Sequence, residues 1–194
     1  MADVAASGRG RSSVDASGIV LAAGSGSRLG QPKADLILGG TRLLDRAIAV
    51  LRAGGCAEVI AVVRAGTRAE GATLVVNPQP ERGLGSSLRI GLAAASGRVA
   101  VIMLVDTPGV GATAVRRVLA VGGPVAVATY SGRRGHPVVI DRAYWPEVAA
   151  LAQADHGARP FLTAHPDLVT EVACEGDPRD LDTPADLDAW QARS

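Results

Sequence analysis

Apolar residues in this chain fall into short continuous runs that alternate with stripes at helical spacing. Runs such as GIVLAAG at 18–24 are rich in Val, Ile and Leu, which is typical of strands buried on both faces of a sheet. Segments such as 41–55 instead repeat apolar residues every three or four positions, which predicts a helix with one buried face. Thr41 and Thr183 are candidate N-caps of the first and last helices. The pattern predicts strands within 18–24, 58–66, 72–80, 98–110, 124–130, 136–140 and 167–174, and helices over 41–55, 85–96, 111–121, 143–153, 157–165 and 183–193.

This alternation of strands and helices predicts an α/β fold of three layers, αβα, around a mostly parallel, Rossmann-like sheet. The strands at 124–130 and 136–140 are separated only by the turn SGRRG, so they can pair as a hairpin and interrupt the alternation. We expect a single domain over 18–194. A flexible tail is expected over 1–17, because that segment consists mainly of Gly, Ser and Ala.

The composition excludes several classes of partner. Apolar residues make up 47% of the chain but aromatic residues only 3%, so the core must consist of Val, Leu, Ile and Ala. The net charge of +1 gives no large field to attract nucleic acid or an anionic membrane. No apolar run approaches the ~18 residues of a membrane span. Cys56 and Cys174 lie far apart without a CxxC spacing, which predicts two reduced thiols in a cytoplasmic protein.

Three segments with reactive side chains each follow a predicted strand: GSGSRLGQPK at 24–33, NPQPERGLGSS at 77–87 and DTPGV at 106–110. Ligands of doubly wound sheets bind beyond the carboxyl ends of the strands. We therefore expect the three segments to meet at one edge of the sheet.

The first of these segments is either an ordinary tight turn or a cradle for phosphate groups, since free backbone N–H groups attract anionic oxygens. Its spacing fits neither common phosphate-binding motif. A dinucleotide fold requires a third glycine where Leu29 stands, and a P-loop requires Ser or Thr where Ala34 follows the lysine. DTPG at 106–109 alone therefore does not indicate a GTPase. Lys33 is the only lysine among 20 basic residues.

The stretch LAAGSGSRLGQPKADL at 21–36 resembles the signature LAAGxGxRxG…PK of sugar-nucleotide-type nucleotidyltransferases. The resemblance implies the fold of the nucleotide-diphospho-sugar transferases and a loop that wraps a nucleoside triphosphate. It places Arg28 at the β- and γ-phosphates and Lys33 at the α-phosphate. The nucleotide-binding residues expected on this basis are Leu21, Ala22, Ala23, Gly24, Gly26, Arg28, Lys33, Asn77, Gly83, Ser86 and Ser87.

Nucleotidyl transfer gives a chemical reason for both cations. A phosphate oxygen attacks the α-phosphorus and pyrophosphate leaves, so negative charge is stabilised by positioned cations. Arg28 can bind two phosphate oxygens with its planar fork, and Lys33 offers a compact charge for a single phosphoryl group. The expected catalytic residues are Arg28, Lys33 and Asp106.

Four further segments narrow the resemblance to the molybdenum cofactor cytidylyltransferases and their MobA-related kin. NPQPERGLGSSLRIGL resembles N…GMSSSLRxGL, LVDTPGV resembles LxDxPxV, and SGRRGHPVVI resembles GxRGHPV. DHGARPFL together with RDLDTPADL resembles GDxGAR…DIDTPEDL. Position 85 departs from the pattern, because it holds Gly where the family usually has Ser. The resemblance implies transfer of CMP from CTP to a molybdopterin-type cofactor, with Mg²⁺ and release of pyrophosphate, and a molybdoenzyme that receives the product.

Asp106 is the first candidate ligand for Mg²⁺, because it ends the central strand and Mg²⁺ takes one or two carboxylates beside phosphate oxygens and water. Asp182 matches the family residue before Thr-Pro, with Asp180 as the alternative. The residues expected to bind the acceptor, and its anionic group, are Arg134, Gly135, His136 and Arg159. Nothing in the sequence pairs His136 with a Ser or Cys nucleophile, so no hydrolytic triad is expected.

Alternatives stay open on substrate and activity. A guanylyltransferase would use GTP on the same cofactor or on a small phosphorylated acid. The related guanylyltransferases tend to begin LAGG, so Ala23 favours the cytidylyl branch. A non-enzymatic protein of this type would bind a nucleotide or the molybdenum cofactor and pass it to a partner enzyme.

Overall fold

The computed structural model describes residues 15–192; residues 1–14 and 193–194 lie outside the described part. Most of the tail expected over 1–17 therefore lies outside it too. Ala16 and Ser17 belong to the fold, because they open the first strand and are fully buried. The strand thus begins two residues before its expected start.

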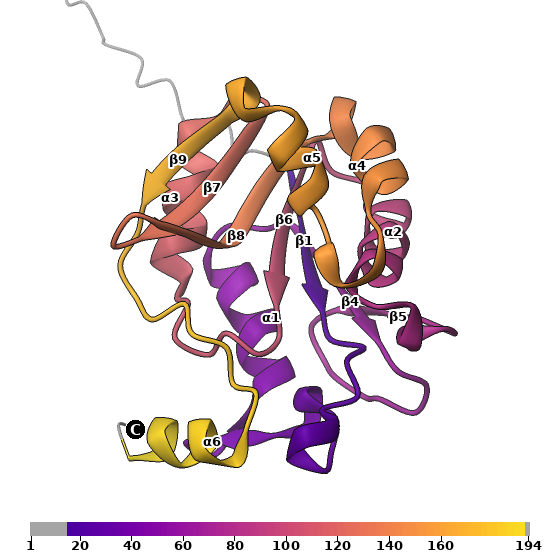
Figure 1. Ribbon diagram of the computed structural model, residues 1–194, viewed down its shortest axis with the longest axis vertical. Coiled ribbons are helices and arrows are strands. Elements are labelled where there is room, and N and C mark those ends of the chain that lie inside the picture. Colours follow the sequence, from indigo (N-terminus) through magenta and orange to yellow (C-terminus); the bar gives the residue numbers. More distant parts are fainter. Residues whose placement is uncertain (1–14, 193–194) are drawn as a thin grey trace, which may run out of the picture.

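A seven-stranded sheet forms the centre of the molecule, in the order β5-β4-β1-β6-β8-β7-β9 (Figure 1). Its pairs are parallel except those that β8 makes with β6 and β7. The strands are β1 Ala16–Leu21, β4 Glu58–Val63, β5 Thr73–Val76, β6 Val99–Leu104, β7 Val125–Tyr130, β8 Arg133–Asp141 and β9 Val169–Ala173. The expected mostly parallel sheet with one hairpin is confirmed.

Helices cover both faces of this sheet, as expected for three layers (Figure 1). They are α1 Leu43–Ala53, α2 Leu84–Ala94, α3 Ala112–Val121, α4 Trp145–Leu151, α5 Arg159–Ala164 and α6 Pro184–Gln191. Thr183 caps α6 in a capping box, with Pro184 at the first turn, as the sequence predicts. No helix of the described residues is long and apolar enough to cross a membrane.

The expected boundaries differ from the observed ones in two places. The helix expected over 41–55 begins only at Leu43, because Thr41–Arg42 forms strand β3 and pairs with β2, Ile37–Leu38. Thr41 is therefore not its cap. Strand β8 begins at Arg133, inside the expected turn SGRRG, so the turn of the hairpin shrinks to residues 131–132.

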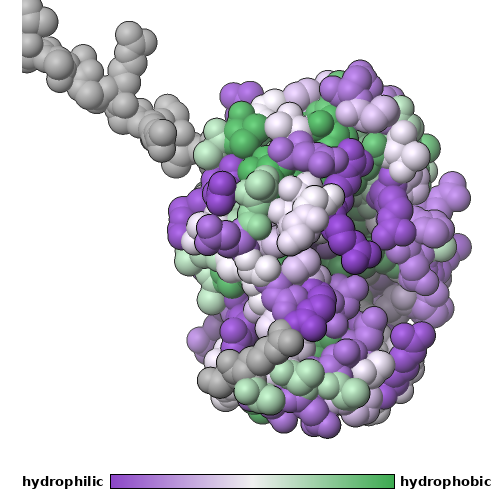
Figure 2. Space-filling view, turned by 60° about the vertical axis from the view of Figure 1, so that its left-hand side comes forward, coloured by the Kyte–Doolittle hydropathy of each residue, from purple (hydrophilic) through white to green (hydrophobic). Residues whose placement is uncertain are grey.

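Strand alternation divides the core into two apolar clusters. In β1, Val20 packs with α1 and α3 on one face, whereas Ile19 and Leu21 pack with α2, α4 and α5 on the other. On the face shown in Figure 2, hydrophilic side chains surround smaller apolar groups. Cys56 and Cys174 are both free thiols, and burial raises the pKa of Cys56 to about 12.

Gly91 lets α2 lie close to the sheet. A Cβ at this position would stand 2.6 Å from Ile19 Cγ2 and 3.2 Å from Val62 Cγ2. Both neighbours are buried strand residues that cannot move aside cheaply. The absence of a side chain at position 91 therefore sets the distance between helix and sheet.

We predict that Gly91→Ala lowers the free energy of unfolding by about 1–3 kcal/mol, because overpacking outweighs the gain in helix propensity. Chemical denaturation would measure the change, with Ala93→Ser on the exposed side of α2 as the control. A Gly91→Ala variant as stable as the wild type would contradict the close packing.

Candidate active site

The register of two neighbouring strands brings distant residues into one site. Leu21 at the end of β1 pairs with Leu104 at the end of β6, and the strands are parallel. The loop over 22–33 and the segment that begins at residue 105 therefore leave the sheet side by side. Lys33 and Asp106 meet there, although 73 residues separate them.

Lys33 lies between two carboxylates. Its Nζ donates to Asp106 Oδ2 at 2.6 Å and also to Asp182 Oδ1. Burial opposes the charge of the ammonium, but the two carboxylates outweigh this effect and raise the pKa of Lys33 above its ordinary value. Lys33 is therefore a charged, oriented cation at the end of the glycine loop.

The C-terminal carboxylate is held in place by the backbone around it. Leu181 is fully buried, and its N–H donates to the carbonyl of Asp106 at 2.8 Å. The N–H of Asp182 donates to Asp186 at 3.2 Å, within the capping box of α6. These contacts fix the segment before α6 against the end of β6, so Asp182 faces Lys33.

Asp180 adds a third acidic group. Desolvation in the pocket raises its pKa to about 6, and the nearby charges of Asp106 and Asp182 contribute while Lys33 opposes them. It is Asp182 that shares Lys33 with Asp106, so the geometry favours Asp182 over Asp180 as the second ligand. Three carboxylates around one ammonium leave an excess of negative charge.

The residues present fit a divalent cation that arrives together with phosphate groups. Asp106 Oδ1 is buried and has no hydrogen-bond partner, so one oxygen of the carboxylate is available to a cation. Among the described residues, no three His, Cys, Asp or Glu side chains form a complete metal site. Mg²⁺ suits such an incomplete set, because it commonly takes one or two carboxylates and completes its shell with phosphate and water.

The glycine loop curls tightly in front of this cluster. Gly26 has φ 60°, and a Cβ there would lie 2.0 Å from the carbonyl oxygen of Gln31. Arg28 is exposed on the same loop and makes no hydrogen bond or ion pair within residues 15–192. Its guanidinium is therefore free to bind an anion beside Lys33.

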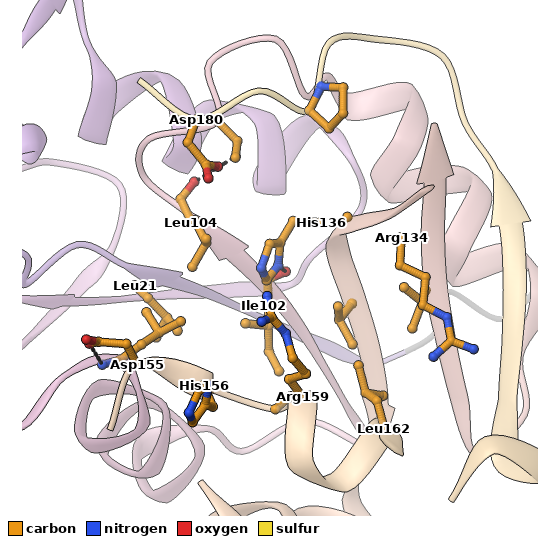
Figure 3. Close-up of a pocket in the computed structure, with 18 of the residues that line it drawn as sticks. Leu21, Ile102, Leu104, Arg134, His136, Asp155, His156, Arg159, Leu162 and Asp180 are labelled. Atoms are coloured by element: carbon orange, nitrogen blue, oxygen red, sulfur yellow. Dashed lines mark hydrogen bonds between the residues drawn. The ribbon is translucent and has the colours of Figure 1, made fainter. Parts of the chain in front are cut away.

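A pocket of about 820 Å³ opens next to the acidic cluster (Figure 3). Its floor is apolar, and its rim carries arginines together with Asp180 and Asp182. The floor consists of Leu21, Leu88, Ile102, Leu104, Val127 and Val138. The lining also contains the four residues expected to bind the acceptor, Arg134, Gly135, His136 and Arg159, so the structure brings them together.

Residues 18–169 match the MobA-like NTP transferase domain. The chain belongs to this family. Nicotine blue oxidoreductase of Paenarthrobacter nicotinovorans is 40% identical over 186 residues, which cover 86% of this chain and 91% of that protein. These findings, with the fold, identify the MobA-like protein as a nucleotidyltransferase.

Solved structures agree with this assignment. A homologue of Mycobacterium tuberculosis Rv0371c, from Mycobacterium sp. strain JC1, has a TM-score of 0.82 at 30% identity, over 92% of this chain and 96% of that chain. Rv0371c from M. tuberculosis H37Rv, solved in complex with manganese, has a TM-score of 0.78 at 29% identity, over 93% and 100%. The expected fold of the nucleotide-diphospho-sugar transferases is thereby confirmed.

Several residues expected to contact the nucleotide have structural partners in this MobA-like transferase. The buried Asn77 donates to Ser86 Oγ at 2.8 Å and to Ser87 Oγ at 3.0 Å. Gly83 has φ 81°, and a Cβ there would lie 2.7 Å from the carbonyl oxygen of Ala154. These residues fix the start of α2, and their contact with a nucleotide stays a prediction.

The beginning of the signature is also structural in its side chains. Leu21, Ala22 and Ala23 are buried, and the N–H of Ala22 donates to the carbonyl of Val62 at 2.8 Å. Gly24 is exposed at the start of the free loop. Leu21 lines the pocket, whereas Ala22 and Ala23 contribute their backbone alone to any contact outside the core.

Two features of the pocket are not evident from the sequence. Arg134 is paired with Glu171 of β9 at 2.7 Å, so it is less free than expected. Tyr130 lines the pocket and donates through its hydroxyl to the carbonyl of His136 at 2.7 Å. The sequence signal for Tyr130 is weak, because an aromatic residue at the end of a buried strand is also typical of core packing.

We predict that Lys33→Met increases the affinity of the nucleotide-free protein for Mn²⁺ by about tenfold or more. A unit charge ~4 Å away is worth about 4 kcal/mol at an effective dielectric of ~20, before solvent screening. Electron paramagnetic resonance of free Mn²⁺ would measure the binding. Arg28→Met removes a cation that does not contact the carboxylates, so its Mn²⁺ affinity should equal that of the wild type. Equal affinities of the wild type and Lys33→Met would contradict the competition between Lys33 and the metal.

Proposed function

We propose that the protein transfers CMP from CTP to a molybdopterin-type molybdenum cofactor and releases pyrophosphate, with Mg²⁺ as the metal. The observation that carries this proposal is Lys33, held between Asp106 and Asp182 at the end of a glycine loop and beside an apolar pocket. The resemblance of Ala23 and the RGHP segment to the cytidylyl branch supports CTP and the cofactor.

The chain's residues divide the work of phosphoryl binding. Arg28 binds the β- and γ-phosphates with its free guanidinium, and Lys33 moves to the α-phosphate. Mg²⁺, when bound, neutralises phosphate oxygens, and Asp106 and Asp182 would hold it. An oxygen of the acceptor phosphate forms the new bond to the α-phosphorus, and the bond to the β-phosphate oxygen breaks. The acceptor phosphate is largely ionised near pH 7, so it needs no general base.

The pocket suits a flat acceptor with an anionic group. Its volume of about 820 Å³ lies within the ~300–1,000 Å³ of small-molecule sites. The apolar floor can contact the faces of a ring system, and Arg159 at the rim can bind the phosphate. The product would then pass to a molybdoenzyme.

A second candidate function follows from the 40% identity with nicotine blue oxidoreductase. The same apolar pocket can accommodate a planar aromatic substrate, which a reduced nicotinamide nucleotide would reduce. The cation and carboxylates of Lys33, Asp106 and Asp182 have no evident use in that reaction, so transfer is the first proposal.

The test is pyrophosphate release from CTP or GTP with molybdopterin cofactor and Mg²⁺. We expect turnover with CTP to exceed turnover with GTP. Equal or greater turnover with GTP would replace the cytidylyl assignment by the guanylyl one. A phosphorylated small acid as the better acceptor would replace the cofactor. Nucleotide binding without turnover would indicate a carrier, and nicotine blue reduction without transfer would favour the oxidoreductase.

Variants test the residues of the mechanism. We predict that Asp106→Asn and Lys33→Arg each lower kcat by about 100-fold or more, while circular dichroism and the melting temperature show a folded protein. Arg is bulkier than Lys and spreads its charge over a plane, so it cannot replace the point charge between two carboxylates. Wild-type turnover of either variant would contradict the assignment. Arg98→Lys, at an exposed position before β6, is the matched control.

A further inference from the structure

The pocket opens where β6 and β8 part. Their pairing ends at Ile102 and Val138, and the register of β7 with β8 shifts between Val127 and Thr129. Beyond this point the imidazole of His136 turns back toward β6, and its Nδ1 lies 3.2 Å from the carbonyl oxygen of Ile102. Figure 3 shows the ring in the middle of the pocket, close to Arg159.

The Ile102 contact determines which nitrogen of His136 carries a proton. A backbone carbonyl can only accept a hydrogen bond, so Nδ1 must be the donor. In a neutral imidazole, Nε2 then carries the lone pair. No residue within the described part of the chain forms a hydrogen bond with Nε2.

Two groups hold His136 in this orientation. The Tyr130 hydroxyl donates to the His136 carbonyl at 2.7 Å, and burial raises the pKa of Tyr130, so this hydroxyl stays a donor. At the other end of His136, Ile102 fixes the ring. The nitrogen that faces the pocket is therefore positioned before any ligand binds.

His136 is neutral near pH 7.5, because an ordinary histidine is already mostly deprotonated there. Burial lowers its pKa further, and Arg159 adds to this effect, while the Ile102 carbonyl and Asp106 oppose it. A neutral nitrogen with a lone pair does not attract an anion. The expected contact of His136 with an anionic acceptor group therefore does not suit this geometry, and that contact suits Arg159.

We infer that His136 determines acceptor specificity by presenting Nε2 as a fixed hydrogen-bond acceptor to an N–H or O–H group on the acceptor's ring. The inference rests on the proposed function for the identity of the acceptor, but the orientation of His136 does not. Discrimination of this kind is strong in an apolar pocket, because a buried polar group left without its partner is costly.

Nuclear magnetic resonance of the free protein tests the orientation without any substrate. The chain has three histidines, so imidazole ¹⁵N signals can be assigned by single substitutions. We expect the long-range ¹H–¹⁵N pattern of an Nδ1–H, Nε2-unprotonated ring for His136 at pH 7.5. A protonated ring, or the Nε2–H tautomer, would overturn the inference even if cytidylyl transfer is observed.

Two pterin-like probes test the selection. Pterin carries N–H donors on its ring, whereas 1,3-dimethyllumazine has methyl groups on both pyrimidine-ring nitrogens and lacks N–H donors. We expect pterin to shift the Nε2 resonance of His136 and 1,3-dimethyllumazine to leave it in place. Equal shifts with both, or none with either in a protein that transfers CMP to the cofactor, would overturn the inference.

Kinetics with the molybdopterin cofactor provide the third readout. We expect His136→Phe to lower kcat/KM for the cofactor by about 100-fold with an unchanged KM for CTP. His136→Gln keeps an acceptor atom and should recover part of this loss. Equal losses in both variants, or a matching rise in the KM for CTP, would show that His136 only fills space. A wild type without transfer activity would refute the proposed function and leave the tautomer and probe results to decide the role of His136.

Discussion

The contact of Lys33 with Asp106 and Asp182 is the interaction on which the site depends. Three segments that are far apart in the sequence converge on one ammonium: the glycine loop after β1, the end of β6 and the segment before α6. Parallel pairing of β1 with β6 brings the first two together, and the Leu181 N–H brings the third. Because the ammonium stands where a metal would bind, entry of a metal requires Lys33 to move. A phosphate group gives the lysine a new partner.

The pocket beside this cluster separates two kinds of recognition. Apolar strand residues form its floor, and Arg159 offers positive charge at the rim. His136 differs from the arginines, because its ring is tied to Ile102 and offers a lone pair. An acceptor can therefore be held by its anionic group at one point and read by its ring donors at another. A relative with 40% identity is named as an oxidoreductase, so recognition of the ring is what distinguishes the substrates that such a pocket could take.

Most of the fold and the location of the site could be predicted from the sequence. Buried runs and helical stripes predict the strand and helix order, since periodicity reflects burial directly. The short hairpin over 37–42 was missed, because two-residue strands leave no periodic signal. Motif spacing placed Lys33 near Asp106, but a sequence does not show which side chains satisfy one another. Asn77 bonds Ser86 and Ser87, and His136 bonds a backbone carbonyl, and both contacts depend on tertiary geometry.

The most direct test uses the fact that the chain contains one lysine. Protein made with lysine that carries ¹⁵N at Nζ gives a single side-chain ammonium signal, that of Lys33. The signal of the free protein should show an ammonium protected from exchange and still protonated above the ordinary lysine pKa. Saturating CTP with Mg²⁺ should shift it, because Lys33 leaves the carboxylates for the α-phosphate. A signal that stays in place with bound CTP and Mg²⁺ would contradict the central role given to Lys33.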